Sequence, residues 1–303
     1  MQVSVPYIES HPLAGELLSR AQVLYTDLDG TLLGRGGSVL ASASGEPTLE
    51  TVRAITRLNA EDLAVVPVSG RNRLQLAEIT RLLGWHHGFI AEIGCVVVPG
   101  RGEPPVYFTG DWPEDALLPG ETPFGAIERV GAYELLTRAF PGRIEHHTPY
   151  HLNREATFVL RGNIDADAAR DDLASLELPV ALVDNGIIHP PATTLRGVTE
   201  VHAYHLAPGG VSKTRAVARD IARRGLERAG AVSIGDSATD VWIAGEVGLA
   251  VLVANALDDP RVGDAIEALA ARDPQAAARL AVTHGSNGEG WAEMADAWLT
   301  ARG

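Results

Sequence analysis

Residues 21–31 read Ala-Gln-Val-Leu-Tyr-Thr-Asp-Leu-Asp-Gly-Thr, a short apolar run that ends in an acidic, glycine-containing turn. We expect Ala21–Thr26 to form a buried strand, so that Asp27 and Asp29 follow its carboxyl end. Ligands of open α/β sheets bind at that edge, and Gly30 permits a turn that lets both carboxylates face one site. Two carboxylates this close repel each other, which favours a shared proton or a bound cation. An acidic turn that merely begins a helix is the alternative interpretation.

The alternation of strand and helix continues on both sides of this stretch. Strands that alternate with helices at this spacing predict a parallel sheet covered by helices on both faces, an α/β fold. A hairpin is expected at 95–98 and 106–108. The other strands are expected at 63–68, 89–91, 231–234 and 249–253, and the helices at 48–58, 73–83, 212–224, 241–246 and 261–271.

The middle of the chain has a different composition. Residues 110–125 are rich in proline and glycine, which is typical of a linker. We expect a core of residues 1–108 and 208–303 that is interrupted by an α+β domain of residues 109–207. Within this insert, helices are expected at 127–139 and 165–176, and strands at 156–160, 180–183, 187–188 and 198–205.

Length and composition fit a globular protein of two structural units. The chain has 303 residues, of which 46% are hydrophobic and 21% charged. Its 25 Lys+Arg and 39 Asp+Glu give a net charge of -14, which disfavours nucleic acids and anionic membranes as partners. The single cysteine, Cys95, excludes an intramolecular disulfide, and we expect it to be buried. No signal peptide or membrane span is evident, so a cytoplasmic monomer or homodimer is expected.

A possible phosphate cradle follows the strand expected at 63–68. Ser69 and Gly70 offer a hydroxyl and closely spaced backbone N–H groups at the start of a helix, an arrangement that binds anions. The same two residues also serve as an ordinary helix cap in many proteins. Lys213 follows Pro208-Gly209-Gly210 at the start of another helix, and is either a solvated surface charge or a cation that neutralises bound phosphate.

Two further carboxylates follow the strand expected at 231–234. Asp236 and Asp240 are four residues apart, so a helical turn would place both on one face. Carboxylate oxygens without basic neighbours suit a hard cation such as Mg²⁺. The alternative is that Asp236 simply caps a helix.

In their order along the chain, the four motifs resemble those of the haloacid dehalogenase superfamily of phosphohydrolases. The superfamily pattern is Asp-x-Asp-x-Thr, then Ser or Thr, then Lys, then Gly-Asp-x-x-x-Asp. The long separation of Ser69 from Lys213 leaves room for a large cap, as in the subfamily of Cof-type sugar phosphatases, sucrose-phosphate phosphatase and mannosyl-3-phosphoglycerate phosphatase. The resemblance implies a Rossmann-like core with an inserted α+β cap domain.

The resemblance also assigns roles to the acidic residues. Asp27 would be the nucleophile that forms an aspartyl-phosphate. Asp29 would be the general acid for the leaving alcohol and then the base for the attacking water. Mg²⁺ would be held by Asp27, the backbone carbonyl of Asp29 and Asp236, while Asp240 keeps the site in order.

The same resemblance implies a set of phosphate contacts. Lys213 and Ser69 would hold the phosphoryl oxygens, whose charge must be stabilised during transfer. Asn255 belongs to an Asn-Ala pair that is common in Cof-type members. The full set of expected phosphate-binding residues is Thr31, Ser69, Gly70, Lys213 and Asn255.

One departure concerns the end of the third strand. Many relatives carry Asn-Gly where this chain has Ile93-Gly94, and isoleucine cannot supply the hydrogen bonds of an amide. In the cap, Arg161 is either a surface charge at a strand end or a contact for an anionic substrate. The other polar cap candidates are Arg143, His146, His147, His151, Arg154, His189 and Arg196; we expect the histidines to face solvent or substrate rather than a metal.

The sequence therefore predicts a Mg²⁺-dependent phosphatase of a small phosphorylated metabolite, by default a sugar phosphate or phosphorylated sugar acid. A phosphomutase of the phosphomannomutase type is one alternative, since it shares the aspartyl nucleophile. A non-catalytic protein that binds phosphate esters is the other.

Overall fold

A parallel five-stranded sheet forms the centre of the core in this computed structural model, which describes residues 5–188 and 192–303. Its strand order is β12-β11-β10-β1-β2, and every neighbouring pair is parallel. From β1 the chain moves toward β2 on one side, whereas from β10 it moves toward β12 on the other. The strands are β1 (Val23–Thr26), β2 (Ala64–Pro67), β10 (Ala231–Gly235), β11 (Leu249–Leu252) and β12 (Leu280–Val282).

The point where the strand order reverses lies between β1 and β10. Both strands are buried along their whole length, which explains why their sequences are apolar without alternation. Ligands of doubly wound sheets bind outside the carboxyl ends of the strands at such a reversal. The residues that directly follow β1 and β10 are therefore those placed to form a site.

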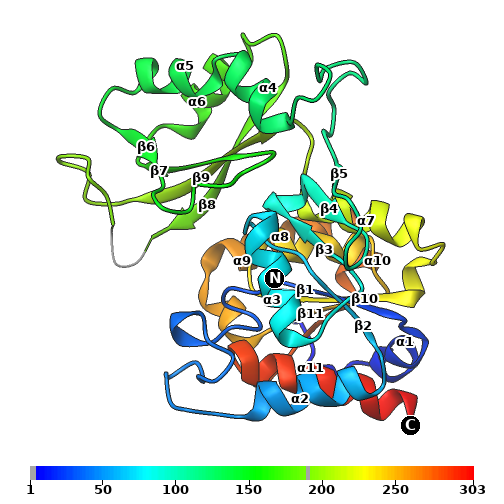
Figure 1. Ribbon diagram of the computed structural model, residues 1–303. Coiled ribbons are helices and arrows are strands. Elements are labelled where there is room, and N and C mark those ends of the chain that lie inside the picture. Colours follow the sequence, from blue (N-terminus) through cyan, green and yellow to red (C-terminus); the bar gives the residue numbers. More distant parts are fainter. Residues whose placement is uncertain (1–4, 189–191) are drawn as a thin grey trace.

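Helices cover both faces of this sheet (Figure 1). On one face α1 and α2 pack against the C-terminal helix α11, and on the other α8 packs against α7 and α9. None of the helices in the described residues is both long and apolar enough to cross a membrane. The helices of the core are α1 (Ala14–Arg20), α2 (Glu50–Ala60), α3 (Arg73–Leu83), α7 (Lys213–Arg223), α8 (Ala238–Val241), α9 (Pro260–Arg272), α10 (Pro274–Ala277) and α11 (Asn287–Arg302).

A small antiparallel sheet extends the core beyond β2. It consists of β3 (Phe89–Ala91), β4 (Val96–Val98) and β5 (Val106–Tyr107). A parallel bridge from Val68 to Ile90 joins this sheet to the end of β2. Cys95, between β3 and β4, is fully buried, as expected.

A four-stranded antiparallel sheet of order β6-β7-β9-β8 forms the inserted domain. Helices cover the face that points away from the core, and the other face is turned toward the core (Figure 1). The insert has its own hydrophobic cluster. Its elements are α4 (Pro123–Arg129), α5 (Ala132–Ala139), β6 (Ile144–His146), β7 (Phe158–Gly162), α6 (Ala166–Leu173), β8 (Val180–Ile187) and β9 (His202–Pro208).

The two connections between core and insert lie side by side. The backbone N–H of Asp111 donates to the carbonyl of Gly209 at 2.8 Å. Gly110 has a φ of 62°, and a Cβ there would lie 2.1 Å from the Gly209 oxygen. Only glycine at residue 110 therefore allows the two connecting segments to approach this closely.

The predicted fold class is confirmed, but several predicted elements have different bounds. The helix expected at 127–139 is two helices, because Gly131 between them has a φ of 73°. The strands expected at 180–183 and 187–188 are the single strand β8, which contains an irregularity after Asp184. The helix expected at 241–246 begins at Ala238 and continues from Trp242 as a 3-10 turn. Elements that the sequence did not predict are α1, β6, β12, α10 and α11.

Candidate active site

Carboxylates from the two central strands meet at the carboxyl edge of the sheet. Asp27 follows β1 and Asp236 follows β10, and the backbone N–H of Asp27 still bonds to Ile234 of the neighbouring strand at 3.0 Å. Asp27 is 8% exposed. A cavity of about 610 Å³ opens at this edge, between the core and the uncovered face of the cap sheet. Seven of the predicted site residues line it: Asp27, Asp29, Ser69, Gly70, Lys213, Asp236 and Asn255.

Lys213 lies between two of the buried carboxylates. Its Nζ donates to Asp27 Oδ1 at 2.7 Å and to Asp240 Oδ1 at 3.0 Å. Burial lowers the pKa of Lys213, but the Asp240 and Asp27 carboxylates outweigh that effect and raise it above its usual value. Burial raises the pKa of Asp27 well above the usual range, although Lys213 acts against the shift. Lys213 is therefore a buried countercharge and not a solvated surface residue.

Asp236 is held against the turn that carries the first motif. Thr31 Oγ1 donates to Asp236 Oδ1 at 3.0 Å. Gly30 has a φ of 88°, and a Cβ at this residue would lie 2.1 Å from Asp236 Oδ2. The absence of a side chain at Gly30 thus leaves room for the carboxylate of Asp236. Burial, reinforced by Asp240, raises the pKa of Asp236 to about 6.

Asp27, Asp236 and Asp240 form a candidate cation site. Each offers one carboxylate oxygen, and these three atoms lie within 4.8 Å of one another. Asp240 is fixed by Ser237, whose backbone N–H donates to Oδ2 at 3.1 Å and whose hydroxyl donates at 2.6 Å. An all-oxygen donor set fits Mg²⁺ better than a softer transition metal.

Asp29 lies apart from this cluster. Its side chain is 56% exposed and forms a two-pronged pair with Arg71, whose Nε lies 2.8 Å from Asp29 Oδ2. Arg71 belongs to the Ser69-Gly70-Arg71 motif but was not predicted as a site residue. Its position two residues after Ser69 is the feature of the sequence that could have indicated Arg71 as a site residue.

The second motif lies under the cap. Ser69 is buried and its hydroxyl accepts from the backbone N–H of Arg71 at 3.3 Å. A Cβ at Gly70 would lie 3.4 Å from the ring of His205, a residue of β9 in the cap. The Gly70 carbonyl accepts from Arg154 Nη1 at 2.6 Å. The cavity wall beside Ser69 is thus built from both domains.

Thr31 and Asn255 make hydrogen bonds that fix the turn of residues 27–31. Thr31 is fully buried and is engaged with Asp236. Asn255 Nδ2 donates to the Gly30 carbonyl at 3.0 Å, and its Oδ1 accepts from the Asn287 backbone N–H at 2.8 Å. Asn287 Nδ2 also donates to the Gly30 carbonyl, at 2.8 Å. These side chains hold the turn in place, and their contact with phosphate stays a prediction.

A buried histidine faces the cavity from the cap. His205 is 4% exposed, and its Nδ1 has no hydrogen-bond partner among the residues that the structure describes. Burial, reinforced by Arg154 and His147, lowers the pKa of His205 to about 3. The imidazole is therefore neutral at ordinary pH. His147, Tyr150, Arg154 and Asn185 are further polar side chains of the cap in the cavity wall.

Glu92 joins the end of β3 to the cap. Its side chain is fully buried and accepts the backbone N–H groups of Glu155 at 2.9 Å, Ala156 at 3.1 Å and Thr157 at 2.8 Å, together with the Thr157 hydroxyl at 2.8 Å. Ile93, the departure from the Asn-Gly pattern, has a φ of 56° and forms part of the cavity wall. At the end of β3, Glu92 thus makes the polar contacts with the cap, and Ile93 gives the cavity wall an apolar surface.

The remaining cap candidates lie in several environments. Arg161 is 8% exposed and pairs with Glu145 at 2.7 Å, so the interpretation as a surface charge is wrong. The His146 ring packs at a tilt against those of Tyr133 and His151, and no metal-ligand cluster includes the cap histidines of the described residues. His189 lies outside the residues that the structure describes.

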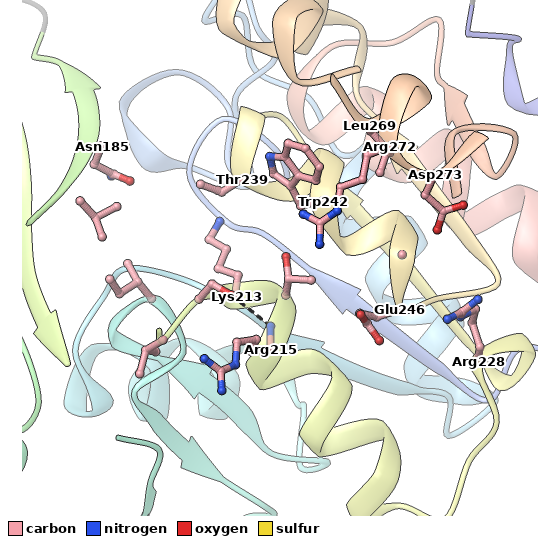
Figure 2. Close-up of a pocket in the computed structure, with 16 residues that line it drawn as sticks. Asn185, Lys213, Arg215, Arg228, Thr239, Trp242, Glu246, Leu269, Arg272 and Asp273 are labelled. Carbon is pink, nitrogen blue, oxygen red and sulfur yellow. Dashed lines mark hydrogen bonds between the residues drawn. The ribbon is translucent and has the colours of Figure 1, made fainter. Parts of the chain in front are cut away.

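A second cavity, of about 560 Å³, adjoins the first (Figure 2). Lys213, Ile93 and Asn185 line both. In Figure 2, Asn185 of cap strand β8 lies across the cavity from Trp242 and Arg272 of the core. The guanidinium of Arg272 lies 6.0 Å from the centre of the Trp242 ring. The space beside Lys213 thus extends beyond the cavity that contains Asp27.

Comparison with known proteins supports the assignment of this fold. No family model matches the chain. A protein of Methanoculleus marisnigri named phosphoglycolate phosphatase is 27% identical over 236 residues, which cover 78% of this chain and 85% of that protein.

Solved structures match over most of the chain. The crystal structure of the protein described as Thermoplasma acidophilum 0175 matches with a TM-score of 0.60 at 17% identity, and the match covers 92% of this chain and 98% of that one. A haloacid dehalogenase-like hydrolase of Bacteroides thetaiotaomicron gives 0.57 at 15% identity, covering 91% and 98%. The sucrose-phosphatase of Synechocystis sp. PCC6803, solved with sucrose and phosphate, gives 0.56 at 13% identity, covering 92% and 98%. The predicted haloacid dehalogenase-like architecture is confirmed, and the named relatives support the predicted enzyme class, a phosphoric monoester hydrolase.

Proposed function

We propose that this chain, which has the fold of the haloacid dehalogenase-like hydrolases, is a Mg²⁺-dependent phosphatase of a small phosphorylated metabolite. The observation that carries the proposal is the buried position of Asp27 at the end of β1, with Lys213 Nζ at 2.7 Å and two further carboxylates beside it. A buried carboxylate next to a cation and a donor set for Mg²⁺ is what phosphoryl transfer to an aspartate requires.

The proposed reaction has two steps. Asp27 attacks the phosphorus atom, the bond to the leaving oxygen breaks, and Asp29 gives its proton to that oxygen. Asp29 then takes a proton from water, which attacks the aspartyl-phosphate and releases phosphate while Asp27 is restored. Lys213 stabilises the charge of the transferred group throughout.

Mg²⁺ would be held by Asp27, Asp236 and the backbone carbonyl of Asp29, with Asp240 ordering the site. When bound, the ion neutralises the phosphoryl group and the crowded carboxylates. The same neutralisation favours the ionised form of Asp27 that attacks, against the effect of its burial. Ser69 and Gly70, which also line the cavity, would contact the phosphoryl oxygens.

The walls of the cavity suggest a leaving group that carries negative charge. Arg71 and Arg154 supply positive charge, while the neutral His147 and His205 supply hydrogen-bonding nitrogens. We therefore propose a short phosphorylated hydroxy acid as the substrate class, which includes phosphorylated sugar acids. The name of the Methanoculleus relative, a phosphatase of phosphoglycolate, is in keeping with this class.

The test is release of inorganic phosphate from a panel of phosphorylated hydroxy acids and neutral sugar phosphates, with Mg²⁺ and with a chelator. We expect release that needs Mg²⁺, prefers the acids and is abolished in Asp27→Asn. An isomerised ester without free phosphate would show a phosphomutase instead. Calorimetric binding of the esters without turnover would show a binding protein, and either result would overturn the proposal.

A further inference from the structure

A second group of metal-ligating side chains lies at the opposite edge of the core. Asp62 is in the turn between α2 and β2, and His86 and His87 lie in the loop between α3 and β3. Both segments precede their strands, so the group is at the amino edge of the sheet, whereas Asp27 is at the carboxyl edge. It shares no residue with either cavity beside Lys213.

The three side chains converge on one point. His86 Nε2 lies 3.3 Å from Asp62 Oδ1 and His87 Nε2 lies 3.6 Å from the same atom. All three ligand atoms lie within 4.8 Å of one another. A tetrahedral ion with bonds of about 2.0–2.1 Å separates its ligand atoms by roughly 3.3 Å. The two distances from Asp62 Oδ1 to the histidine Nε2 atoms are thus close to the distance between two ligand atoms of such an ion.

The donors differ in kind from those of the catalytic cluster. Two imidazole nitrogens and one carboxylate suit Zn²⁺ and its neighbours in the transition series, whereas Mg²⁺ prefers oxygen alone. The two ring centres are 4.0 Å apart with the ring planes tilted by 35°, and both Nε2 atoms lie near the same oxygen, Asp62 Oδ1.

One of the ligand atoms lacks a partner. His87 Nε2 is buried from solvent and makes no hydrogen bond within the described residues. Asp62 and His86 are 74% and 50% exposed, so an ion can enter from solvent. Arg224 is the nearby cation: its Nη2 donates to the His87 carbonyl at 2.6 Å, and its Nε pairs with Asp220, a carboxylate that it shares with Arg223.

We propose that Asp62, His86 and His87 bind a divalent cation of the Zn²⁺ type at the amino edge of the sheet. The ion would join the α2–β2 turn to the α3–β3 loop, with its remaining position open to water. The site is separate from the proposed Mg²⁺ site and does not depend on the phosphatase activity.

The experiment measures Zn²⁺ affinity of the full chain by competition with a chromogenic chelator, with Mg²⁺ in large excess to occupy the carboxylate cluster. Visible absorption of bound Co²⁺ reports the geometry. We expect one tight site, weakened at least tenfold in His86→Ala and in Asp62→Asn. Thermal unfolding of each variant without added Zn²⁺ serves as the check that it is folded.

Two controls keep the proposal open to refutation. His151→Ala removes one ring of another close histidine pair, His146 and His151, which belongs to no metal-ligand cluster of the described residues, and should leave Zn²⁺ affinity unchanged. Asp236→Asn should also leave it unchanged, because Asp236 belongs to the catalytic cluster. Equal affinity in the wild type and in a combined variant of all three ligands would overturn the proposal, as would loss of the site in Asp236→Asn.

Discussion

Arg71 holds the carboxylate of Asp29 with two N–H groups, its Nε lying 2.8 Å from Oδ2 while Nη2 binds Oδ1. In this arrangement Asp29 accepts hydrogen bonds, whereas the proposed role requires it to donate a proton to the leaving oxygen. Substrate binding must therefore separate the pair. An anionic substrate provides the means, because Arg71 also lines the cavity and can transfer its two donors to the incoming charge.

Replacement of Arg71 tests this exchange. We expect Arg71→Ala to raise KM for an anionic substrate by about tenfold or more, because a charged hydrogen bond contributes roughly 1.5–3 kcal/mol. Arg71→Lys should restore little of the loss, since lysine lacks the planar fork that binds a carboxylate at two points. Steady-state kinetics on an acidic and a neutral ester measure the effect. An unchanged KM for both esters in Arg71→Ala would contradict the exchange.

Lys213 should matter for both stability and turnover. Lys213→Ala leaves Asp27 and Asp240 buried without their countercharge, so we expect a loss of about 3–5 kcal/mol in the free energy of unfolding without Mg²⁺. Mg²⁺ should recover part of that loss, and kcat should fall at least about 100-fold. Urea unfolding with and without Mg²⁺ measures the first effect. The control is Arg81→Ala, which removes an exposed pair with Glu78 and should cost under about 1 kcal/mol.

The raised pKa of Asp236 predicts how Mg²⁺ binding depends on pH. Its pKa is about 6 in the folded protein, against a usual value of 3.8. Below pH 6 a proton competes with the cation for this carboxylate, so Mg²⁺ affinity should fall as the pH decreases from 7 to 5. The stability of the metal-free protein should depend on pH in the opposite direction to Mg²⁺ affinity. The contribution of Asp236 to that stability is fully present below pH 3.8 and is lost as the pH rises through 6.

Thermal unfolding measures this dependence directly. The gain in Tm on adding Mg²⁺ should be larger at pH 7 than at pH 5. Asp236→Asn should show little gain at either pH, because the amide neither titrates in this range nor supplies the charge. A gain in the wild type that is the same at both pH values would contradict the assignment of Asp236 as a ligand.

Glu92 should be among the most sensitive positions outside the catalytic cluster. Glu92→Ala leaves two buried backbone N–H groups, one part-buried N–H group and one buried hydroxyl without an acceptor, so we expect a loss of about 3–5 kcal/mol in the free energy of unfolding. Glu92→Gln keeps one acceptor oxygen and should lose less. Glu78→Ala is the matched control, because its glutamate is exposed on α3. A loss in Glu92→Ala no greater than in the control would contradict this role.

The parts of the site that could be predicted are those with a local signal. Asp27 and Asp236 follow apolar runs, and parallel strands bring their carboxyl ends to one edge. The helix Arg73–Leu83 has the predicted bounds because its ends carry local signals, a capping box at Asn72 and a left-handed Gly84.

The parts that could not be predicted depend on distant residues. The partners of Glu92 lie in the cap at 155–157, and nothing in the sequence around it distinguishes a buried carboxylate from a surface one. Asn287 reaches Gly30 from the last helix of the chain. Strand β6 has only three residues, Ile144–His146, too few for a periodic pattern to show.

The adjacent linkers at Asp111 and Gly209 make the insert a module. The chain leaves the core and returns to it at points joined by one 2.8 Å hydrogen bond. A short turn could close the core after the cap is excised, and a cap of another shape could be grafted on the same two ends. Any such transplant must also suit the core side chains that contact the cap away from the linkers: Glu92, which accepts from residues 155–157, Arg73, which pairs with Glu155, and Asn72, which donates to the Leu152 carbonyl. On the proposed function, we expect such a recombination at two neighbouring positions to change the substrate preference, while Asp27 and Asp236 stay where the sheet places them.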